Sequence, residues 1–236
     1  MPARADLRIT VVVPAFQAAA SVGEVVARTR ASVPAARVIV VDDGSSDGTG
    51  SVAAAAGASV VRHDTNRGKG AALRSGVAQV ATGQGGGGSV IVTLDSDGQH
   101  PPEEIPRLVA PIAEGQADLV LGARERTAAM PLGRRLTNRL SAALASRIGG
   151  QSIPDAQTGF RAFTAEIAAL VRPPESHYEY EAAFLLEALA RRVRVASIPI
   201  PTVYHGAPSH FRAVADTWRL ARIFARYGPA ILFGAT

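Results

Sequence analysis

The apolar positions in the first half of the chain fall into short runs of strand length, separated by segments with helical spacing. These runs are almost continuously apolar, as in strands of a parallel sheet that is covered on both faces. Because strands and helices alternate, the pattern predicts an α/β fold with a mostly parallel central sheet flanked by helices. The predicted strands of this half are residues 9–13, 37–41, 59–62, 90–94 and 118–122.

The second half of the chain is more basic and less regular. A helix is predicted to open at Arg134-Arg135 and to end near residue 150, a short aromatic strand to cover 160–163, and a further helix to cover 178–192. A length of 236 residues suffices for one well-buried core, and nothing in the composition requires a second.

The C-terminal segment differs from the rest, so we expect one nucleotide-binding domain over residues 1–205 and a loop with an amphipathic helix over 206–236. The helical pattern places four arginines within an arc of roughly 80°, with aromatic and aliphatic side chains across from them. Such a helix suits a lipid interface, with its arginines towards anionic headgroups. The alternative is a terminal helix packed on the core, with its arginines in water. The four are Arg212, Arg219, Arg222 and Arg226.

Composition narrows the chemistry. The chain has no cysteine, which excludes disulfides, thiolate catalysis and zinc–cysteine sites. Its net charge of +5 favours an anionic partner such as a nucleotide or a phospholipid surface. Nucleic acid is disfavoured because aromatic residues are not interleaved with the basic clusters. No secretory signal or membrane-spanning run is recognisable, so we expect a cytoplasmic protein.

Two carboxylates follow the central apolar run, in Asp95-Ser96-Asp97. In an open α/β sheet, ligands bind beyond the carboxyl ends of the strands, and Asp-x-Asp there offers oxygen ligands to a hard divalent cation on a diphosphate. A turn that caps the next helix is the alternative interpretation of the same residues.

Candidate ligand-binding residues also follow two other predicted strands. Residues Asp42-Asp43-Gly44-Ser45 place more acids after a strand than a turn requires. The turn Gly68-Lys69-Gly70 opens a helix and contains the only lysine of the chain, which suits an anion or the face of a base. Its spacing is not that of a Walker loop. A cluster of Arg124, Arg134 and Arg135 could clamp phosphates, although arginines on a helix are commonly just solvated.

With these segments assembled, the chain resembles the family 2 inverting glycosyltransferases of GT-A fold, in particular the dolichyl- and polyprenyl-phosphate hexosyltransferases. The resemblance covers about residues 9–205 and rests on six segments that occur in the order of the family. They are Val13-Pro14-Ala15-Phe16, Val41-Asp42-Asp43-Gly44-Ser45-Ser46-Asp47-Gly48-Thr49, Asn66-Arg67-Gly68-Lys69-Gly70-Ala71, Asp95-Ser96-Asp97-Gly98-Gln99-His100, Gly122-Ala123-Arg124 and Asp155-Ala156-Gln157-Thr158-Gly159-Phe160-Arg161.

The resemblance implies a GT-A domain over residues 1–205 and a set of site residues. Asp95, Asp97 and Gln99 are implied to hold Mg²⁺ or Mn²⁺ on the sugar diphosphate. One departure concerns base preference: Phe16-Gln17-Ala18 stands where the family commonly has Tyr-Asn-Glu. The residues implied to hold the nucleotide sugar are Pro14, Ala15, Phe16, Asp43, Ser45, Gly68, Lys69, Gly70, Asp95 and Ser96. Those implied in catalysis are Asp97, Arg124, Arg134, Arg135 and Asp155.

The predicted reaction moves a hexose, mannose or glucose, from GDP-mannose or UDP-glucose to a polyprenyl phosphate at a membrane surface. A lipid phosphate is already an anion and needs positioning by arginines, whereas a hydroxyl acceptor needs a carboxylate base. A soluble saccharide or metabolite acceptor is therefore the alternative, and it would require Asp155, Glu179 or Glu181. A nucleotidyltransferase is disfavoured because Pro14-Ala15-Phe16 replaces the glycine-rich loop expected after its first strand.

Overall fold

The computed structural model describes residues 7–81, 88–124, 132–201 and 222–226. Within these residues one sheet runs through seven strands in the order β3-β2-β1-β4-β6-β5-β7. The strands are β1 (Arg8–Ala15), β2 (Arg37–Asp42), β3 (Ser59–Arg62), β4 (Ser89–Thr93), β5 (Leu119–Arg124), β6 (Arg161–Thr164) and β7 (Val195–Ile200). The helices are α1 (Val22–Ser32), α2 (Thr49–Ala55), α3 (Lys69–Ala81), α4 (Ile105–Ala113), α5 (Leu132–Gly149), α6 (Ala165–Leu170) and α7 (Tyr180–Ala190), with a 3₁₀ turn at Pro102–Glu104.

The strand directions confirm the predicted α/β fold with a mostly parallel sheet. Every neighbouring pair is parallel except at β6, which runs antiparallel to both β4 and β5. The sequence predicts neither the direction of β6 nor the existence of β7. β7 pairs only with β5, and most of its residues are half-buried, so it lacks the continuous apolar run of the inner strands.

The first strand extends further than its pattern predicts. We expected Pro14 to end it, but β1 continues to Ala15 and pairs with β2 up to Asp42. The amide of Leu94 donates to the carbonyl of Val12, so alternate backbone groups of β1 face β4. The nitrogen of Pro14 faces the same way, beyond the last residue of β4. The missing N–H of proline therefore removes no ladder hydrogen bond.

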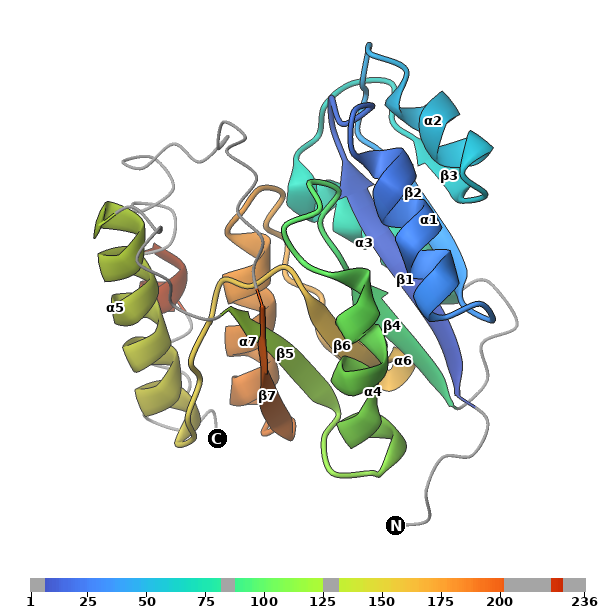
Figure 1. The fold of residues 1–236 in the computed structure, drawn as a ribbon. Coiled ribbons are helices and arrows are strands. Elements are labelled where there is room, and N and C mark those ends of the chain that lie inside the picture. The colour runs from blue at the N-terminus through green and yellow to red at the C-terminus, as the bar shows by residue number, and fades with distance from the viewer. Residues whose placement is uncertain (1–6, 82–87, 125–131, 202–221, 227–236) are drawn as a thin grey trace.

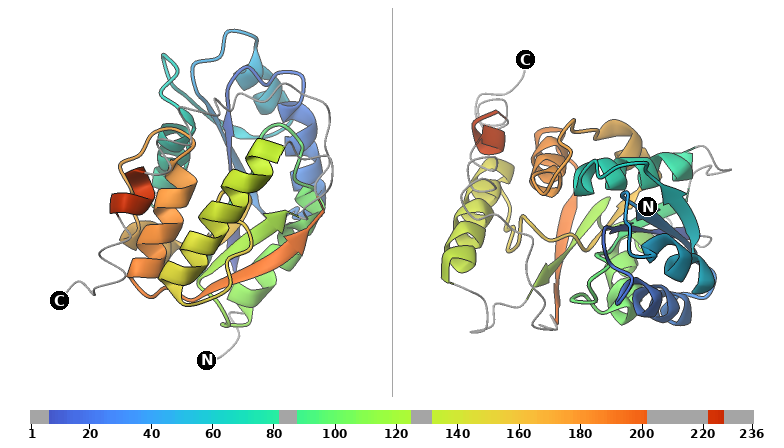
Figure 2. Two further views of the ribbon diagram at one scale, coloured as in Figure 1. Left: turned by 90° about the vertical axis from the view of Figure 1, so that its left-hand side faces the viewer. Right: turned by 90° about the horizontal axis from the view of Figure 1, so that it is seen from above.

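Two hydrophobic layers sandwich the sheet because successive side chains on a strand point to opposite faces. Val11 and Val13 pack in the layer under α1, α2 and α4, whereas Val12 packs in the layer under α3, α6 and α7. In Figure 1, α1 and α4 lie in front of the sheet and α3, α6 and α7 behind it, and the right-hand view of Figure 2 shows the same layers from above. Helix α5 lies at the margin beside α7.

Most of the C-terminal segment lies outside the described residues, including Arg212 and Arg219. The one described turn, 222–226, is helical, and it buries Ile223 and Phe224 in the hydrophobic layer that contains α7. Arg226 contacts the carboxylate of Glu175 at 3.4 Å. This turn packs on the core, as in the alternative interpretation of the helix. No helix in the described part of the chain is long and apolar enough to cross a membrane.

Candidate active site

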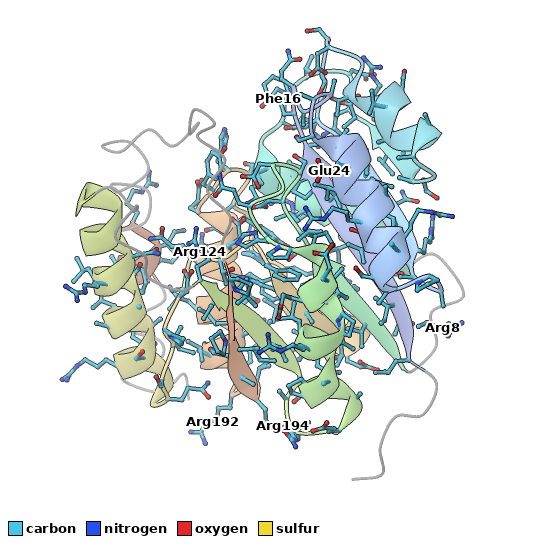
Figure 3. The ribbon with its side chains drawn as sticks, in the orientation of Figure 1. Arg8, Phe16, Glu24, Arg124, Arg192 and Arg194 are labelled. Atoms are coloured by element: carbon cyan, nitrogen blue, oxygen red, sulfur yellow. The ribbon has the colours of Figure 1, made fainter. Side chains whose placement is uncertain are left out.

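Apart from Arg134 and Arg135, the predicted site residues gather at one edge of the sheet, where β1, β2, β4 and β5 end and the antiparallel β6 begins. Phe16, which follows β1, and Arg124, the last residue of β5, lie apart along this edge in Figure 3. The edge divides into two regions. The part that follows β1 and β2 is named the nucleotide-side region after its predicted ligand, and the part that follows β4 and β5 is named the charged region.

In the charged region, the Asp-x-Asp turn is held by its neighbours. The hydroxyl of Ser21, just before α1, donates to the carbonyl of Ser96 at 2.7 Å, and the amide of Gln99 donates to Asp97 at 3.0 Å. Burial, together with the negative charge of Asp95, raises the pKa of Asp97 above its ordinary value. Two carboxylates therefore repel one another here, and a cation would relieve this repulsion.

Lys69 joins this turn to a helix from the other end of the chain. Its ammonium lies 2.7 Å from a carboxylate oxygen of Asp95 and 2.6 Å from one of Glu181, in the first turn of α7. Burial opposes its charge, but the two carboxylates outweigh burial and raise the pKa of Lys69. Burial likewise opposes ionisation of Asp95, whose pKa is nevertheless lowered, chiefly by Lys69. Lys69 and Asp95 are therefore both charged at neutral pH.

Gly159 makes this close approach possible. A Cβ atom at this position would lie 2.8 Å from both carboxylate oxygens of Asp95 and 3.0 Å from the Lys69 ammonium. The backbone at Gly159 is fixed in turn, because the hydroxyl of Thr93 donates to its carbonyl at 2.7 Å. The segment before β6 thus closes over the Lys69–Asp95 pair.

Asp155 and Arg124 form a second buried pair. The guanidinium donates twice to the carboxylate, at 2.7 Å and 3.2 Å, and the amide of Gln157 donates to it at 3.1 Å. Burial opposes ionisation of Asp155, but the Arg124 charge and its hydrogen bonds outweigh burial and hold the pKa of the carboxyl below its ordinary value. Asp155 is therefore an ionised structural partner of Arg124 and a weak proton acceptor.

Arg161, at the start of β6, ties the loop of Asp155 to α7. Its side chain is buried and donates to three backbone carbonyls, those of Thr158, Ala156 and Glu181, at 2.8, 3.0 and 2.5 Å. Burial lowers its pKa, but the guanidinium of arginine stays protonated in proteins. Arg161 thus fixes the loop that contains Asp155 relative to the start of α7, which contains Glu181.

In the nucleotide-side region, Asp43 is surrounded by hydrogen-bond donors. It accepts the backbone amides of Arg67 at 2.9 Å and Gly68 at 2.7 Å, and its Oδ1 lies 2.6 Å from Nδ1 of His63. The other ring nitrogen of His63 lies 2.9 Å from the hydroxyl of Ser75 on α3. Asp43 therefore fixes the turn that leads to Lys69.

The loop after β1 is joined to the loop after β2. The amide of Gln17, a residue with a φ of 51°, donates to Ser45 at 3.0 Å, and the amide of Ala19 donates to Asp47 at 3.0 Å. These bonds explain why α1 begins at Val22 and not at Ala18, where its pattern starts. Phe16 remains 40% exposed beside them, as a residue that contacts a ligand would.

The glycines of the Gly68-Lys69-Gly70 turn pack against the segment before α7. Gly68 has a φ of +93°, and a Cβ there would lie 2.4 Å from the carbonyl of Ser176; one on Gly70 would lie 2.7 Å from Cβ of Tyr180. We expected these glycines to let backbone N–H groups approach a ligand. In this structure they allow the backbone of residues 175–176 to approach closely, and the amide of Gly68 donates to Asp43.

The remaining predicted acceptor residues, Arg134 and Arg135, lie at the beginning of α5. Their side chains fall outside the described residues, so their role as phosphate ligands stays a prediction.

Comparison with known proteins identifies the fold and the family. The family model described as glycosyl transferase family 2 matches residues 10–170. The chain belongs to this family. Its curated relatives include an uncharacterized protein of Methanocaldococcus jannaschii, 32% identical over 202 residues that cover 83% of this chain and 82% of that protein. The undecaprenyl-phosphate mannosyltransferase of Micrococcus luteus is 31% identical over 169 residues, 68% of each chain.

Two further proteins similar to this family 2 glycosyltransferase have names that indicate different acceptors. The polyprenol monophosphomannose synthase of Mycolicibacterium smegmatis is 35% identical over 178 residues, 70% of this chain and 64% of that protein. Glucosyl-3-phosphoglycerate synthase of Mycobacterium tuberculosis, solved with Mn²⁺ and UDP, is 25% identical with a TM-score of 0.76, over 95% of this chain and 81% of that one. The match to solved structures confirms a GT-A-like fold.

The residues at the Asp-x-Asp turn of this glycosyltransferase fit a hard divalent cation. The carboxylates of Asp95 and Asp97 and the side-chain carbonyl of Gln99 would offer oxygen ligands, and the three residues share one turn. The described residues contain no group of three or more His, Cys, Asp or Glu side chains arranged for a metal. Magnesium, however, is commonly held by one or two protein carboxylates, with phosphates and water completing its shell. The donor set thus suits a cation that arrives with a diphosphate.

Several residues of the site were not singled out by their sequence pattern. His63 lies outside the six family segments, and Gly159 lies inside one but was given no role; only the fold brings them to Asp43 and Asp95. His100 is buried against the ring of Phe160, and neither of its ring nitrogens has a hydrogen-bond partner among the described residues. Burial lowers the pKa of His100 to about 4, so it is neutral. The only sequence signal for a role of His100 is that it directly follows Gln99, the last residue of the predicted metal-ligand motif.

Proposed function

We propose that this family 2 glycosyltransferase moves a hexose, mannose or glucose, from a nucleotide diphosphate sugar to a polyprenyl phosphate, with inversion at the anomeric carbon and with Mg²⁺ or Mn²⁺. Two relatives are named for undecaprenyl phosphate and for polyprenol. A lipid acceptor would bring the enzyme peripherally to a membrane surface, with residues 1–205 as the glycosyltransferase domain and residues 206–236 as a separate C-terminal segment.

The observation that carries this proposal is that two of the three candidate bases are neutralised by cations. Asp155 is paired with Arg124 and Glu181 with Lys69. A carboxylate held in an ion pair with a lowered pKa, like Asp155, is a poor acceptor for a hydroxyl proton. An acceptor phosphate arrives already ionised and needs no base, so it matches a site built in this way.

On the donor side, Asp95, Asp97 and Gln99 are the residues that would hold the metal. When bound, a divalent cation would neutralise charge on the departing nucleotide diphosphate. We assign the nucleoside to the nucleotide-side region, with Phe16 exposed beside Pro14 and Ala15. We assign Asp43, Ser45 and the Gly68-Lys69-Gly70 turn to the same nucleoside site, and Ser96 lies between the two proposed metal ligands.

On the acceptor side, we assign the phosphate to the guanidinium groups of Arg124, Arg134 and Arg135. Asp155 orients Arg124 through two hydrogen bonds and so fixes the direction in which a phosphate would be held. The anionic acceptor is thereby placed for attack on the sugar from the face opposite the leaving group.

A hydroxyl acceptor is the second candidate, because Glu179 keeps a buried carboxylate oxygen without a hydrogen-bond partner among the described residues. It precedes α7 and Glu181, so it lies next to the charged region. The solved relative named for glucosyl-3-phosphoglycerate shows that a similar chain can serve a soluble acceptor.

The test is transfer of radiolabelled sugar from GDP-mannose, UDP-glucose and UDP-N-acetylglucosamine, with Mn²⁺ or Mg²⁺, to undecaprenyl phosphate or to 3-phosphoglycerate. We expect label in the organic phase with the lipid and none in the phosphoglycerate product. Asp97→Asn should lower turnover by about 10²- to 10³-fold, as for the loss of a group that stabilises transition-state charge.

Asp64→Asn is the matched control, since Asp64 is exposed and precedes the Lys69 turn. Label only in a soluble product, together with loss of transfer in Glu179→Gln, would replace the lipid acceptor by a hydroxyl acceptor.

A further inference from the structure

Lys69 contacts two carboxylates, and only one of them is a proposed metal ligand. Asp95 is a proposed metal ligand at the end of β4, whereas Glu181 comes from α7 and is not among the proposed ligands. The ammonium lies at nearly equal distances from the two, 2.7 Å and 2.6 Å. A protein cation therefore already occupies one side of the carboxylate that a divalent metal ion would share.

The position of the ammonium is built into the fold. Lys69 is the first residue of α3, and the glycines on either side of it pack against residues 175–180. Gly159 leaves just enough room above the Lys69–Asp95 pair, and the ring of Tyr178 lies 5.7 Å from the ammonium. The lysine cannot withdraw far, so any change in its pairing is a shift between Asp95 and Glu181.

The ammonium of Lys69 is shared between two carboxylates. Asp95 and Glu181 both contact it, and Asp97 follows Asp95 in the same turn. The nearby guanidinium of Arg161 donates to backbone carbonyls, so it takes no part in this pairing. Without Glu181, Lys69 would pair with Asp95 alone. Without Lys69, Asp95 would lose its ammonium partner.

We propose that Lys69 and Glu181 form a positioning pair that sets the affinity of the site for its divalent cation. Glu181 holds the ammonium while Asp95 turns to the metal, and Lys69 limits the excess negative charge that the three carboxylates create. This inference rests on the proposed metal site and adds two residues that do not touch the metal.

The two partners predict opposite effects on Mn²⁺ affinity, measured by titration calorimetry or by the electron paramagnetic resonance of free Mn²⁺, with UDP or GDP present and without acceptor. Glu181→Gln should weaken Mn²⁺ binding about tenfold, and Lys69→Met should strengthen it by a similar factor, as expected for one unit charge at several ångströms in a partly screened site. The double variant Lys69→Met/Glu181→Gln should return to near the wild-type affinity.

Glu187→Gln is the matched control, because Glu187 lies on the same helix but pairs with Arg191 at 3.0 Å, and it should leave the affinity unchanged. Damage to the fold would weaken binding in both single variants and more in the double, so that pattern overturns the proposal, as does an unchanged affinity in both. If Lys69→Met does not fold, Glu181→Gln and the double variant still carry the comparison.

Failure of the proposed metal site has a separate signature. In that case the wild type does not bind Mn²⁺, or Asp97→Asn binds it as tightly as the wild type, whatever the two positioning variants do. Loss of binding in Asp97→Asn together with equal affinity in wild type, Glu181→Gln and Lys69→Met would overturn the positioning role alone.

Discussion

The two regions of the candidate active site hold their carboxylates in different ways. In the nucleotide-side region, Asp43 and Asp47 accept backbone amides, so each acid is part of the loop scaffold. In the charged region, Asp95 and Asp155 face the side-chain cations Lys69 and Arg124. Backbone amides cannot leave their acceptor without unfolding a loop, whereas a side-chain cation can exchange partners. The first region is thus preformed, and the second can respond to a charged ligand.

The largest effect should follow from breaking the buried pair of the charged region. Arg124→Met leaves Asp155 buried without its counter-charge, which should lower the free energy of unfolding by about 3 to 5 kcal/mol. Urea unfolding measures this. The control is Arg28→Met, because Arg28 binds Glu103 and Glu24 in largely exposed pairs, worth at most about 1 kcal/mol. Equal losses in the two variants would mean that burial does not distinguish the charged region.

A smaller loss is expected in the nucleotide-side region. Asp43→Asn removes one of two carboxylate oxygens that accept amides, so a buried N–H loses its partner at a cost of about 1 to 3 kcal/mol. The turn before Lys69 should loosen, and the KM for the nucleotide sugar should rise more than kcat falls. Asp64→Asn serves again as the control. A fall in kcat at constant KM would place Asp43 in the charged region's chemistry instead.

The smallest effect concerns acid stability. Because the folded-state pKa of Asp155 lies below its ordinary value of 3.8, its ionisation stabilises the fold fully above that value, and the contribution is lost as the pH falls through the lower, folded-state pKa. Between about pH 5 and about pH 2, Asp155→Asn should therefore lose less unfolding free energy than the wild type, in urea titrations at each pH. Parallel curves for the two proteins would contradict the lowered pKa.

The sequence predicts four of the parallel strands well because a buried parallel strand has a continuous apolar run. β1, β2, β4 and β5 all occur where such runs are found. The direction of β6 could not be predicted, because a four-residue strand has the same pattern whichever way it runs. β7 was missed for a related reason: an edge strand need not be apolar throughout.

The position of the site could be predicted because acids at strand ends converge on one edge of a parallel sheet. Which acid pairs with which cation could not. Lys69 was expected to face a nucleoside, and nothing local to it indicates Glu181, which a separate helix brings into contact. Asp155 was expected to act in catalysis, or as the base for a hydroxyl acceptor, and only its contact with Arg124 identifies an ion pair. Metal ligation and acceptor contacts stay predictions.

The reversed direction of β6 frees the preceding part of the chain from the constraints on crossover connections. Parallel neighbours must be joined by a long right-handed crossover, but β5 and β6 are antiparallel, so the chain leaves and re-enters the sheet at the same edge. The insert between them, which contains α5, can therefore change in length or be exchanged without altering the order of the strands. The fold is modular at this position: chimaeras that exchange only the α5 segment between Arg124 and Asp155 would keep the ion pair of these two residues and the order of the strands.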